Sequence, residues 1–341
     1  MLNFRKLTEH TITMDKTVST TGASPHGVFH IDQAALLPEQ IRFGTSSWTY
    51  PGWQGLIYQQ SYKNEADLKR RSLEEYVRFP WFRTVGIDSA FYAPLTTATL
   101  RRYAEQVPQS FQWVAKVWEA ITVPEFAPLK RYGDRAGKVN PDFLNADLFV
   151  ERVLQPCSAD DIKPHVGPFV FQFQSLPRCT SDSAARFVER LDDFLAQLPK
   201  EFQYATEVRN REILQPAYFA ALNKHGATHC FNHWTAMPPL IDQMHAAADA
   251  GGINAPFYVA RVLTPIGVRY EDAVKRFSPY DRLQAPIPQL RQDLIRLGLR
   301  AMKRNVRLFI LVNNRAEGCA PVTIDQVGKE IVAAAGAAPV S

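Results

Sequence analysis

The sequence predicts an α/β protein built as a single (β/α)8 barrel of the TIM type. Eight short apolar segments recur along the 341 residues, and segments of helix length separate them. Most of the eight segments end in a polar or charged residue. Strand and helix alternating eight times is typical of this barrel, whose functional groups stand at the carboxyl ends of its strands. The pattern therefore predicts an architecture and the position of a site within it.

The predicted strands are short runs rich in β-branched and aromatic residues. They cover residues 41–45, 84–88, 111–116, 168–174, 202–209, 227–233, 256–261 and 306–313. Helices are expected between them at 65–79, 96–106, 142–154, 181–198, 216–224, 242–250, 287–303 and 324–335. Segment 181–198 has the clearest amphipathic pattern, because Phe187, Leu191 and Leu195 recur at helical spacing. Thr96 has the side chain of a helix N-cap.

Two kinds of segment lie outside this repeat. Residues 1–40 are polar and rich in Thr and Ser, and we expect an N-terminal extension that is partly flexible, with residues 28–40 packed against the barrel. Residues 41–341 then form the barrel domain. The connections 118–141 and 264–283 are long, and connections beyond about 12–15 residues are usually functional or mobile.

Composition excludes several classes of protein. Hydrophobic residues make up 46% and charged residues 21% of the chain, which is ordinary for a globular protein with a large core. The net charge of +5 comes from interspersed charges of both signs, so a basic face that attracts anions is compatible with it. The four cysteines show no paired spacing, which argues against a disulfide framework or a structural zinc site and favours a cytoplasmic location. No apolar run is long enough to cross a membrane, and we expect no membrane partner.

Side-chain alternation brings polar groups together at one end of the predicted barrel. Residues two apart on a strand share a face. In the fourth strand Phe169 and Phe171 should pack on the helices, and Gln172 and Gln174 should point inward. The same reasoning applied to the other strands places seven polar residues at one mouth: Asp88, Lys116, Gln174, Glu207, Arg209, Arg261 and Asn313.

This polar cluster has two interpretations. Charges without partners are costly to bury, so the cluster could be an ion-pair network that closes the top of the barrel. It could equally be a preorganised polar pocket for a ligand. We favour the pocket, because most of the strands contribute to it and long polar loops surround it.

Six motifs that include these residues follow one another along the chain. They are GTSSWTYPGW at 44–53, DSAFYAP at 88–94, a third strand that ends in Lys116, FQFQSLP at 171–177, Glu207-Val208-Arg209, and NNRAEGCAP at 313–321. In this order and spacing, from about residue 41 to residue 327, the chain resembles the YecE-like family, which carries a domain of unknown function 72. The resemblance implies a TIM-type barrel and supplies no reaction.

The residue types in the cluster suggest the handling of protons and anions. Glu207 and Asp88 are the candidates for general acid or base, although Glu207 could instead bridge Lys116 and Arg209. Lys116 is a candidate catalytic residue, as an anion-binding cation or as a Schiff-base nucleophile. Arg209 and Arg261 offer guanidinium groups that match phosphate or carboxylate oxygens.

Other candidates for substrate binding surround these charges. Asn313 and Gln174 would hold the substrate. The aromatic side chains Trp48, Tyr50 and Tyr92 could stack on a sugar or a base, or could cover the barrel mouth with apolar bulk. The small residues after the eighth strand lead into a helix near Thr323, whose N-terminus could also bind an anion.

No sequence pattern points to a metal or a cofactor. His229 and His233 are four apart, a spacing that holds two strand residues too far from each other to share one ion. Dinucleotide-binding, Walker and serine-hydrolase motifs are absent from the sequence. We therefore expect neither a metal nor a cofactor.

Three functional hypotheses remain open. The first is a metal-independent enzyme, of hydrolase or lyase/isomerase type, that acts on a small or sugar-like anionic substrate. The second is a nucleic-acid-binding or repair-type barrel, suggested by the cations Lys130, Arg131, Arg135 and Lys138. The third is a non-catalytic binder of a small ligand. The sequence leaves the oligomeric state open.

Overall fold

Eight parallel strands form the centre of the molecule. The computed structural model describes residues 29–176 and 179–337. The strands are β1 (Ile41–Thr45), β2 (Thr84–Ile87), β3 (Gln112–Lys116), β4 (Val166–Gln172), β5 (Tyr204–Glu207), β6 (Thr228–His233), β7 (Phe257–Val262) and β8 (Arg307–Val312). Their order is β1-β8-β7-β6-β5-β4-β3-β2, and every pairing along it is parallel. The predicted (β/α)8 barrel is confirmed.

Gly44 and Gly86 allow β1 and β2 to approach each other where the barrel closes, since a methyl group on Gly86 would lie 2.9 Å from the Ser46 carbonyl oxygen. A single bridge joins Phe43 to Phe82, and the Arg83 amide donates to the Phe43 carbonyl at 2.8 Å. A methyl group on Gly44 would lie 2.0 Å from the carbonyl oxygen of Thr84. Any side chain there would push the two strands apart, since real contacts of a Cβ atom are never so short.

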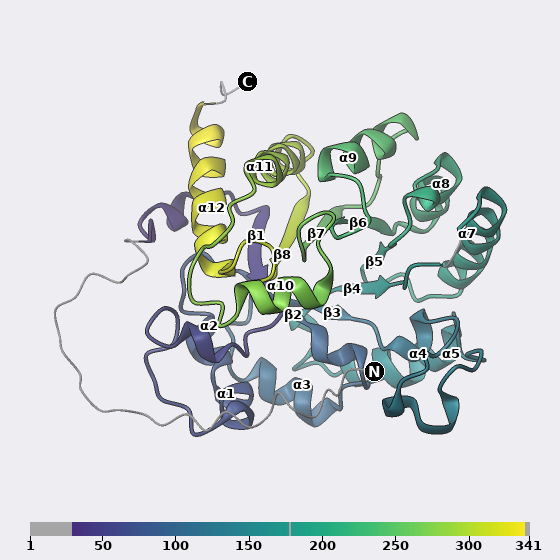
Figure 1. Ribbon diagram of the computed structural model, residues 1–341, viewed down its shortest axis with the longest axis horizontal. Helices are drawn as coiled ribbons and strands as arrows, with labels where there is room; N and C mark the ends of the chain where they lie inside the picture. The colour runs from purple at the N-terminus through teal and green to yellow at the C-terminus, as the bar shows by residue number, and fades with distance from the viewer. Residues whose placement is uncertain (1–28, 177–178, 338–341) are drawn as a thin grey trace.

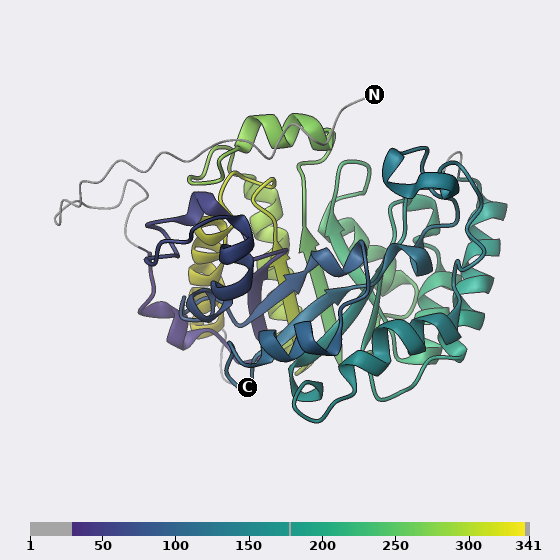
Figure 2. The same ribbon diagram turned by 90° about the horizontal axis from the view of Figure 1, so that it is seen from below.

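Helices surround the strands as an outer layer (Figure 1). The helices of the described residues are α1 (Glu65–Arg71), α2 (Leu73–Tyr76), α3 (Thr97–Ala104), α4 (Glu119–Thr122), α5 (Ala146–Phe149), the π-helix η6 (Val150–Leu154), α6 (Gln155–Cys157), α7 (Ser181–Ala196), α8 (Pro216–His225), α9 (Leu240–Asp249), α10 (Tyr270–Phe277), α11 (Pro288–Lys303) and α12 (Ala320–Ala337), of which α10 lies apart from this layer (Figure 2). Short 3-10 turns are η2 (Gln33–Leu36), η3 (Pro51–Trp53), η4 (Asp88–Phe91), η5 (Lys130–Arg135), η7 (Lys163–His165) and η8 (Arg211–Ile213).

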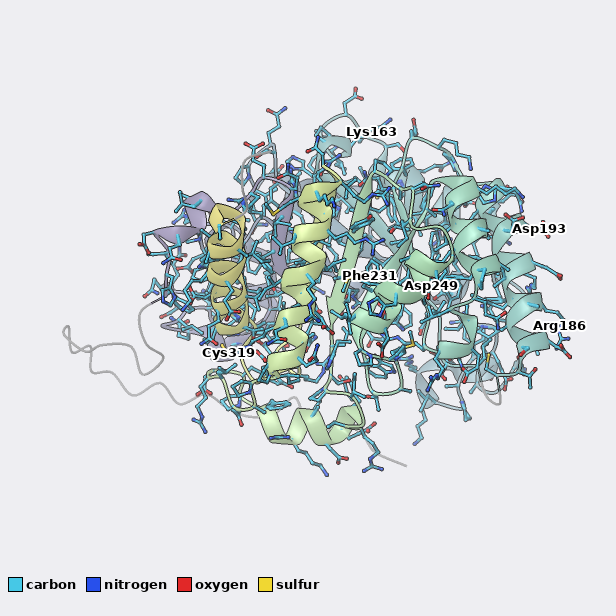
Figure 3. All side chains as sticks on the ribbon, turned by 90° about the horizontal axis from the view of Figure 1, so that it is seen from above. Lys163, Arg186, Asp193, Phe231, Asp249 and Cys319 are labelled. Atoms are coloured by element: carbon cyan, nitrogen blue, oxygen red, sulfur yellow. The ribbon has the colours of Figure 1, made fainter. Side chains whose placement is uncertain are left out.

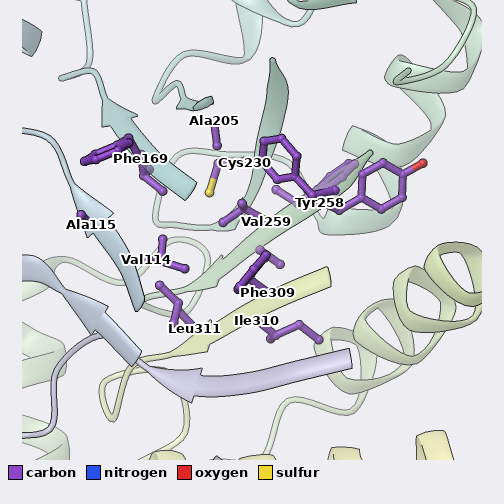
Figure 4. Packing of buried hydrophobic residues seen from close by; sticks show 14 of the residues in the cluster. Val114, Ala115, Phe169, Ala205, Cys230, Tyr258, Val259, Phe309, Ile310 and Leu311 are labelled. Atoms are coloured by element: carbon purple, nitrogen blue, oxygen red, sulfur yellow. The ribbon is translucent and has the colours of Figure 1, made fainter. Parts of the chain in front are cut away.

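The interior of the barrel is filled with small and branched side chains. Val114, Ala205, Cys230, Val259 and Leu311 come from different strands and point toward one another (Figure 4). All of them are buried. This apolar layer supports the polar groups that stand above it at the carboxyl ends of the same strands.

The outward faces of the strands pack on the helices, as the alternation of β4 predicts. Phe171 contacts Phe149 of α5 and Phe194 of α7, with ring centroids 5.0 and 5.2 Å apart respectively. Helix α7 begins with a capping box, in which Thr180 accepts from the Ser183 amide and the Ser183 side chain accepts from the Thr180 amide. The outward packing predicted for Phe171 on the helices is confirmed.

Several element boundaries differ from the prediction. Strand β4 begins two residues earlier and ends at Gln172, so Gln174 lies in the following loop. Strand β5 ends at Glu207, which leaves Arg209 just beyond it. The helix expected at 65–79 is divided at Ser72, whose hydroxyl donates to the Leu68 carbonyl at 2.6 Å and competes with the helical pattern.

The two long connections contain structure of their own. Segment 118–141 includes α4 and η5, and segment 264–283 includes α10. Helix α10, expected as loop, buries Ala273 and Phe277 and lies across one end of the barrel, apart from the ring of helices (Figure 2). Figure 3 shows that the same end carries Cys319, which follows β8, whereas Lys163, which precedes β4, lies at the other end. Helix α10 therefore lies over the carboxyl ends of the strands.

Residues 29–40 pack against the barrel domain, as predicted. The His30 amide donates to Asp325 of α12 at 2.7 Å, and Arg83 donates to the carbonyls of Ala34 and Leu37. The rest of the proposed flexible extension lies outside the described residues. All four cysteines are unpaired. Within residues 29–176 and 179–337, no helix combines the length and the hydrophobicity that crossing a bilayer requires.

Candidate functional site

Four charged side chains form a continuous chain of ion pairs at the barrel mouth. Arg261 of β7 donates to Glu207, at the end of β5, with an Nη1–Oε2 distance of 2.7 Å. Its Nη2 atom donates to both carboxylate oxygens of Asp88, which follows β2, at 2.8 and 2.9 Å. Arg209 donates to the second oxygen of Glu207. Segments far apart in the sequence are thus joined across the mouth.

Burial strengthens this network, because charges interact more strongly away from water. The side chain of Glu207 is 0% exposed and that of Arg261 is 2% exposed. Burial alone would raise the pKa of Glu207, but Arg209 and Arg261 outweigh it and lower the pKa to about 2. Burial by itself would lower the pKa of Arg261. The neighbouring carboxylates of Asp88 and Glu207 have the larger effect, so the pKa of Arg261 is raised.

Lys116, at the end of β3, lies within the field of these four groups. Its ammonium nitrogen is 3.7 Å from the centre of the Phe91 ring. Burial lowers the pKa of Lys116 to about 7, with Arg261 and Arg209 adding to the effect and Asp88 and Glu207 opposing it. At neutral pH this amine is therefore divided between its charged and neutral forms.

Arg209 has hydrogen-bonding capacity that the described protein does not use. Its Nη2 atom is bound to Glu207, and its guanidinium carbon lies 4.2 Å from the ring centre of Trp234. The Nε and Nη1 atoms are buried and find no acceptor among residues 29–176 and 179–337. Buried N–H groups nearly always have a partner, so these donors mark a place for an acceptor that is not part of the described chain.

The net charge of the side chains at the mouth also favours an anionic ligand. Asp88 and Glu207 carry two negative charges, and Arg209 and Arg261 carry two positive charges. Protonated Lys116 adds one unit, which leaves the five side chains with a single positive charge. An anion bound at the mouth would neutralise that excess and raise the pKa of Lys116.

Two further residues predicted for the site, Asn313 and Gln174, follow strands β8 and β4 and are not part of the ion-pair chain. Asn313 follows β8 beside β7, since its amide donates to the Val262 carbonyl at 2.7 Å. Its side-chain oxygen accepts from the Arg315 amide at 3.0 Å and so shapes the loop. Gln174 lines a separate cavity of about 490 Å³ next to Phe143 and Arg190. No contact joins Gln174 to the ion-pair chain.

The predicted aromatic residues occupy three different environments. Trp48 is 2% exposed and packs edge-on against Tyr103 of α3, at 5.0 Å between ring centroids. Tyr50 packs between Trp53 and Tyr280. Tyr92 is 61% exposed, so it is the one of the three predicted aromatics whose ring is open to a ligand.

A second set of residues lies around the mouth, and of these only Arg131 was a candidate from the sequence. Arg315, after β8, stacks on Tyr270 of α10 at 4.5 Å, and Arg131 of η5 lies 5.2 Å from the Tyr92 ring centre. Trp234, which covers Arg209, follows β6 directly. The position of Trp234 just past a strand end is a signal that could have identified it, whereas the contacts made by α10 depend on a helix that was expected as loop.

The helix N-terminus proposed as an anion site is occupied by the protein itself. Helix α12 begins at Ala320, whose amide donates to Asn314 at 2.8 Å. Glu317 accepts from the Thr323 hydroxyl at 2.8 Å and pairs with Arg291. Side chains of the protein itself, Asn314 at the Ala320 amide and Glu317 at the Thr323 hydroxyl, are therefore already bound at the start of this helix.

The two histidines of β6 are both bound to other parts of the protein, and His229 lies against the outer helices. His229 contacts Tyr218 of α8 and Gln243 of α9, both at 3.0 Å, and burial lowers its pKa to about 4. His233 bonds the Thr264 carbonyl at 2.9 Å. In the part of the chain that the structure describes, no group of three or more His, Cys, Asp and Glu side chains is arranged to hold a metal ion.

Comparison with solved structures shows the same fold in two proteins of one family. A DUF72 family protein from Enterococcus faecalis is 16% identical, and the match covers 86% of this chain and 95% of that chain with a TM-score of 0.56. A DUF72 family protein from Thermotoga maritima is also 16% identical, with coverages of 85% and 98% and a TM-score of 0.54. At this identity the likeness concerns the fold. No match was found among curated proteins.

The family model described as "Protein of unknown function DUF72" matches residues 42–339. This range includes all of β2 to β8, all of β1 except Ile41, and every residue of the ion-pair chain. It also confirms the resemblance found in the six motifs, since the YecE-like proteins are the DUF72 family. The chain belongs to the DUF72 family.

Proposed function

We propose that the barrel mouth binds the phosphate or carboxylate group of a small molecule between Arg209 and Lys116, and that the protein is an enzyme acting on that molecule. The observation that carries the proposal is the pair of unsatisfied buried donors on Arg209. The unsatisfied Nε and Nη1 groups lie on different edges of the planar guanidinium, so each can donate one separate hydrogen bond to an oxygen of the ligand. The net positive charge of the cluster supports the same ligand class.

Lys116 is the group best suited to move a proton. A base works best when its pKa is close to the working pH, and the pKa of Lys116 is about 7. The neutral amine can accept a proton from a substrate carbon or from a water molecule, which suits isomerase, lyase or hydrolase chemistry. A neutral amine could also attack a carbonyl carbon, and reduction with borohydride in the presence of substrate would distinguish that route by labelling Lys116.

The contacts of the two carboxylates favour different roles. Both oxygens of Glu207 are engaged by arginines, so its acid/base role, expected from the sequence, has less support than a role in orienting Arg209 and Arg261. Asp88 keeps 30% of its side chain exposed and bonds only one nitrogen of Arg261. Asp88 therefore has free lone pairs with which to accept a proton or a hydroxyl group.

Sulfate binding provides a direct test, because sulfate keeps its charge across the pH range in which Lys116 titrates. Calorimetric titration should detect binding to the parent protein and at least tenfold weaker binding to Arg209→Gln. The matched control is Arg211→Gln, which removes an exposed arginine two residues further along the same loop and should leave the affinity unchanged. Circular dichroism would verify that each variant is folded.

The pH dependence tests the part assigned to Lys116. Binding of sulfate to the parent should weaken between pH 6 and pH 8.5, as the ammonium loses its proton. The Lys116→Met variant should bind more weakly at pH 6 and lose that dependence. Equal sulfate affinity in the parent and in Arg209→Gln would refute the proposed site.

A second candidate is binding of nucleic acid at the rim. Arg131, in the basic turn η5, lies over the exposed ring of Tyr92, and an exposed ring beside a cation is a typical platform for an unpaired base. Arg131 also pairs with Glu119 at 3.0 Å, which lowers its availability to phosphate. Fluorescence anisotropy with labelled single-stranded DNA and RNA at several salt concentrations would decide, since binding to phosphates must weaken as salt rises.

A further inference from the structure

A second cavity adjoins the candidate site on the side of β1 and β2. Its volume is about 330 Å³, at the lower end of the range for small-molecule pockets. It is lined by the loop after β1, by the exposed face of α1 and by the end of β2. The lining residues are Ser47, Trp48, Thr49, Glu65, Ala66, Lys69, Gly86, Ile87, Asp88 and Ser89.

Polar groups of three kinds face one another around this cavity. Ser47, Thr49 and Ser89 supply hydroxyl groups, of which those of Ser47 and Thr49 bond each other at 3.0 Å. Helix α1 supplies Glu65 and Lys69, which are spaced i,i+4 but do not pair with each other. The lining therefore offers both hydrogen-bond donors and acceptors, as recognition of a molecule bearing several hydroxyl groups requires.

Trp48 adds an unsatisfied donor to the lining. It is 2% exposed, and its Nε1 atom finds no acceptor among residues 29–176 and 179–337. A buried indole N–H usually has a hydrogen-bond partner. Trp48 therefore combines a place in the cavity lining with a buried donor that the described residues leave unsatisfied.

Asp88 connects this cavity to the ion-pair chain. Its carboxylate bonds Arg261 at the mouth, and the same residue lines the cavity. Asp88 therefore belongs both to the candidate anion site and to this cavity.

We propose that the cavity lined by Ser47, Asp88 and Lys69 binds the polyhydroxylated part of the substrate, such as a sugar ring or a short polyol chain. This inference rests on the proposed function, because the anionic end of the same molecule lies at the mouth. The substrate class is then a hydroxylated organic phosphate or carboxylate. Asp88 accepts a hydroxyl group of the substrate, and Lys69 and Glu65 bind hydroxyl groups further along it.

The experiment compares ligands that share the anion and differ in the rest. Isothermal titration would measure the affinities of inorganic phosphate, hexyl phosphate and a set of polyol and sugar phosphates with three to six carbons. At least one hydroxylated phosphate should bind ten times more tightly than hexyl phosphate. Ala66→Trp, which fills the cavity from an exposed position on α1, should abolish this preference without weakening phosphate binding.

A matched pair of variants on α1 tests the cavity contacts. Lys69→Met should reduce the preference for the hydroxylated ligand by at least threefold. Arg70→Met removes the neighbouring positive charge, which is outside the cavity, and should not change it. Both side chains are exposed, so neither variant should affect folding.

The outcomes separate the two proposals. If phosphate binds and no hydroxylated ligand gains over hexyl phosphate, the cavity proposal is wrong and the anion site stands. A preference that survives Ala66→Trp equally refutes the cavity as its source. If neither phosphate nor any of its esters binds, the anion site and the cavity proposal both fail.

Discussion

Replacing Glu207 by Gln removes the central charge of the ion-pair chain while keeping the size of the side chain. Glu207 is fully buried, and its two oxygens accept from Arg209 and Arg261. In the variant, two buried guanidinium groups face a neutral amide, and the amide NH2 takes the place of one acceptor. Removing one partner from a buried network of this kind is strongly destabilising.

The magnitude follows from the pKa of Glu207. It falls from an ordinary value of 4.5 to about 2 in the folded protein. One pKa unit corresponds to about 1.4 kcal/mol, so the ionised carboxylate contributes about 3 kcal/mol to the free energy of unfolding. Because the pKa is lowered on folding, this contribution is complete above about pH 5 and is lost as the pH falls toward 2.

Urea unfolding at 25 °C, followed by circular dichroism and tryptophan fluorescence, would measure the loss. Coincident transitions from the two probes are needed before a free energy is assigned. At pH 7 the Glu207→Gln variant should be less stable than the parent by about 3 kcal/mol. The difference should remain nearly constant down to pH 5 and then shrink.

The control is Glu74→Gln, which removes a carboxylate that is 60% exposed and pairs with Arg78 on the surface. Its effect should be within about 0.5 kcal/mol. A loss below about 1 kcal/mol for Glu207→Gln at pH 7 would refute the reasoning, because the buried pairs would then contribute no more than surface pairs do. A loss that does not shrink in acid would show that charge is not its cause.

Three further predictions concern other buried positions. Lys116→Met should stabilise the protein by about 5 kcal/mol at pH 6, because the pKa of Lys116 falls from 10.5 to about 7 on folding and each pKa unit corresponds to about 1.4 kcal/mol. Denaturant titrations should show this gain fading toward pH 10, since only the unfolded chain holds the proton between about pH 7 and 10; an unchanged stability at pH 6 would contradict the burial of Lys116. Gly328→Ala should cost about 1–3 kcal/mol, since its methyl group would lie 2.4 Å from the Trp81 ring. The control is Gly336→Ala on the same helix, where the added methyl group meets no other atom, and its effect on stability should be neutral or slightly favourable. Equal melting temperatures for the two variants would refute the clash between residue 328 and Trp81. On acidification from pH 7 to pH 4, the His229→Gln variant should lose about 3 kcal/mol less of its free energy of unfolding than the parent does. The reason is that His229 stays neutral down to about pH 4 in the folded protein, whereas it takes up a proton near pH 6.5 in the unfolded chain. An equal dependence of stability on pH in the parent and the variant would argue against this.

The positions of the site residues were predictable to the extent that strand alternation fixes them. Glu207 and Arg261 lie on strands whose parity could be read from the sequence, and they meet at the mouth as expected. Gln174 has the same parity in the sequence, yet it lies two residues beyond the end of β4, where alternation no longer applies. It lines another cavity for that reason.

The loops could not be predicted to the same degree. Helix α10 is short, and its position over the mouth depends on packing by Ala273 and Phe277 and not on helix propensity. The contact between Arg315 and Tyr270 follows from that position and joins loops after β7 and β8. Neither motif order nor periodicity carries information about which loops meet.

The sequence by itself determined the eight-stranded barrel, its family and the end of the barrel where charged side chains gather. These properties depend on periodicity and on local residue type, which are present in the chain before it folds. Only the tertiary structure decided that Glu207 is held by two arginines, that Arg209 keeps two donors unsatisfied, and that the pKa of Lys116 falls to about 7. Those properties depend on distances between strands far apart in sequence and on the exclusion of water, which exist only once the barrel has closed.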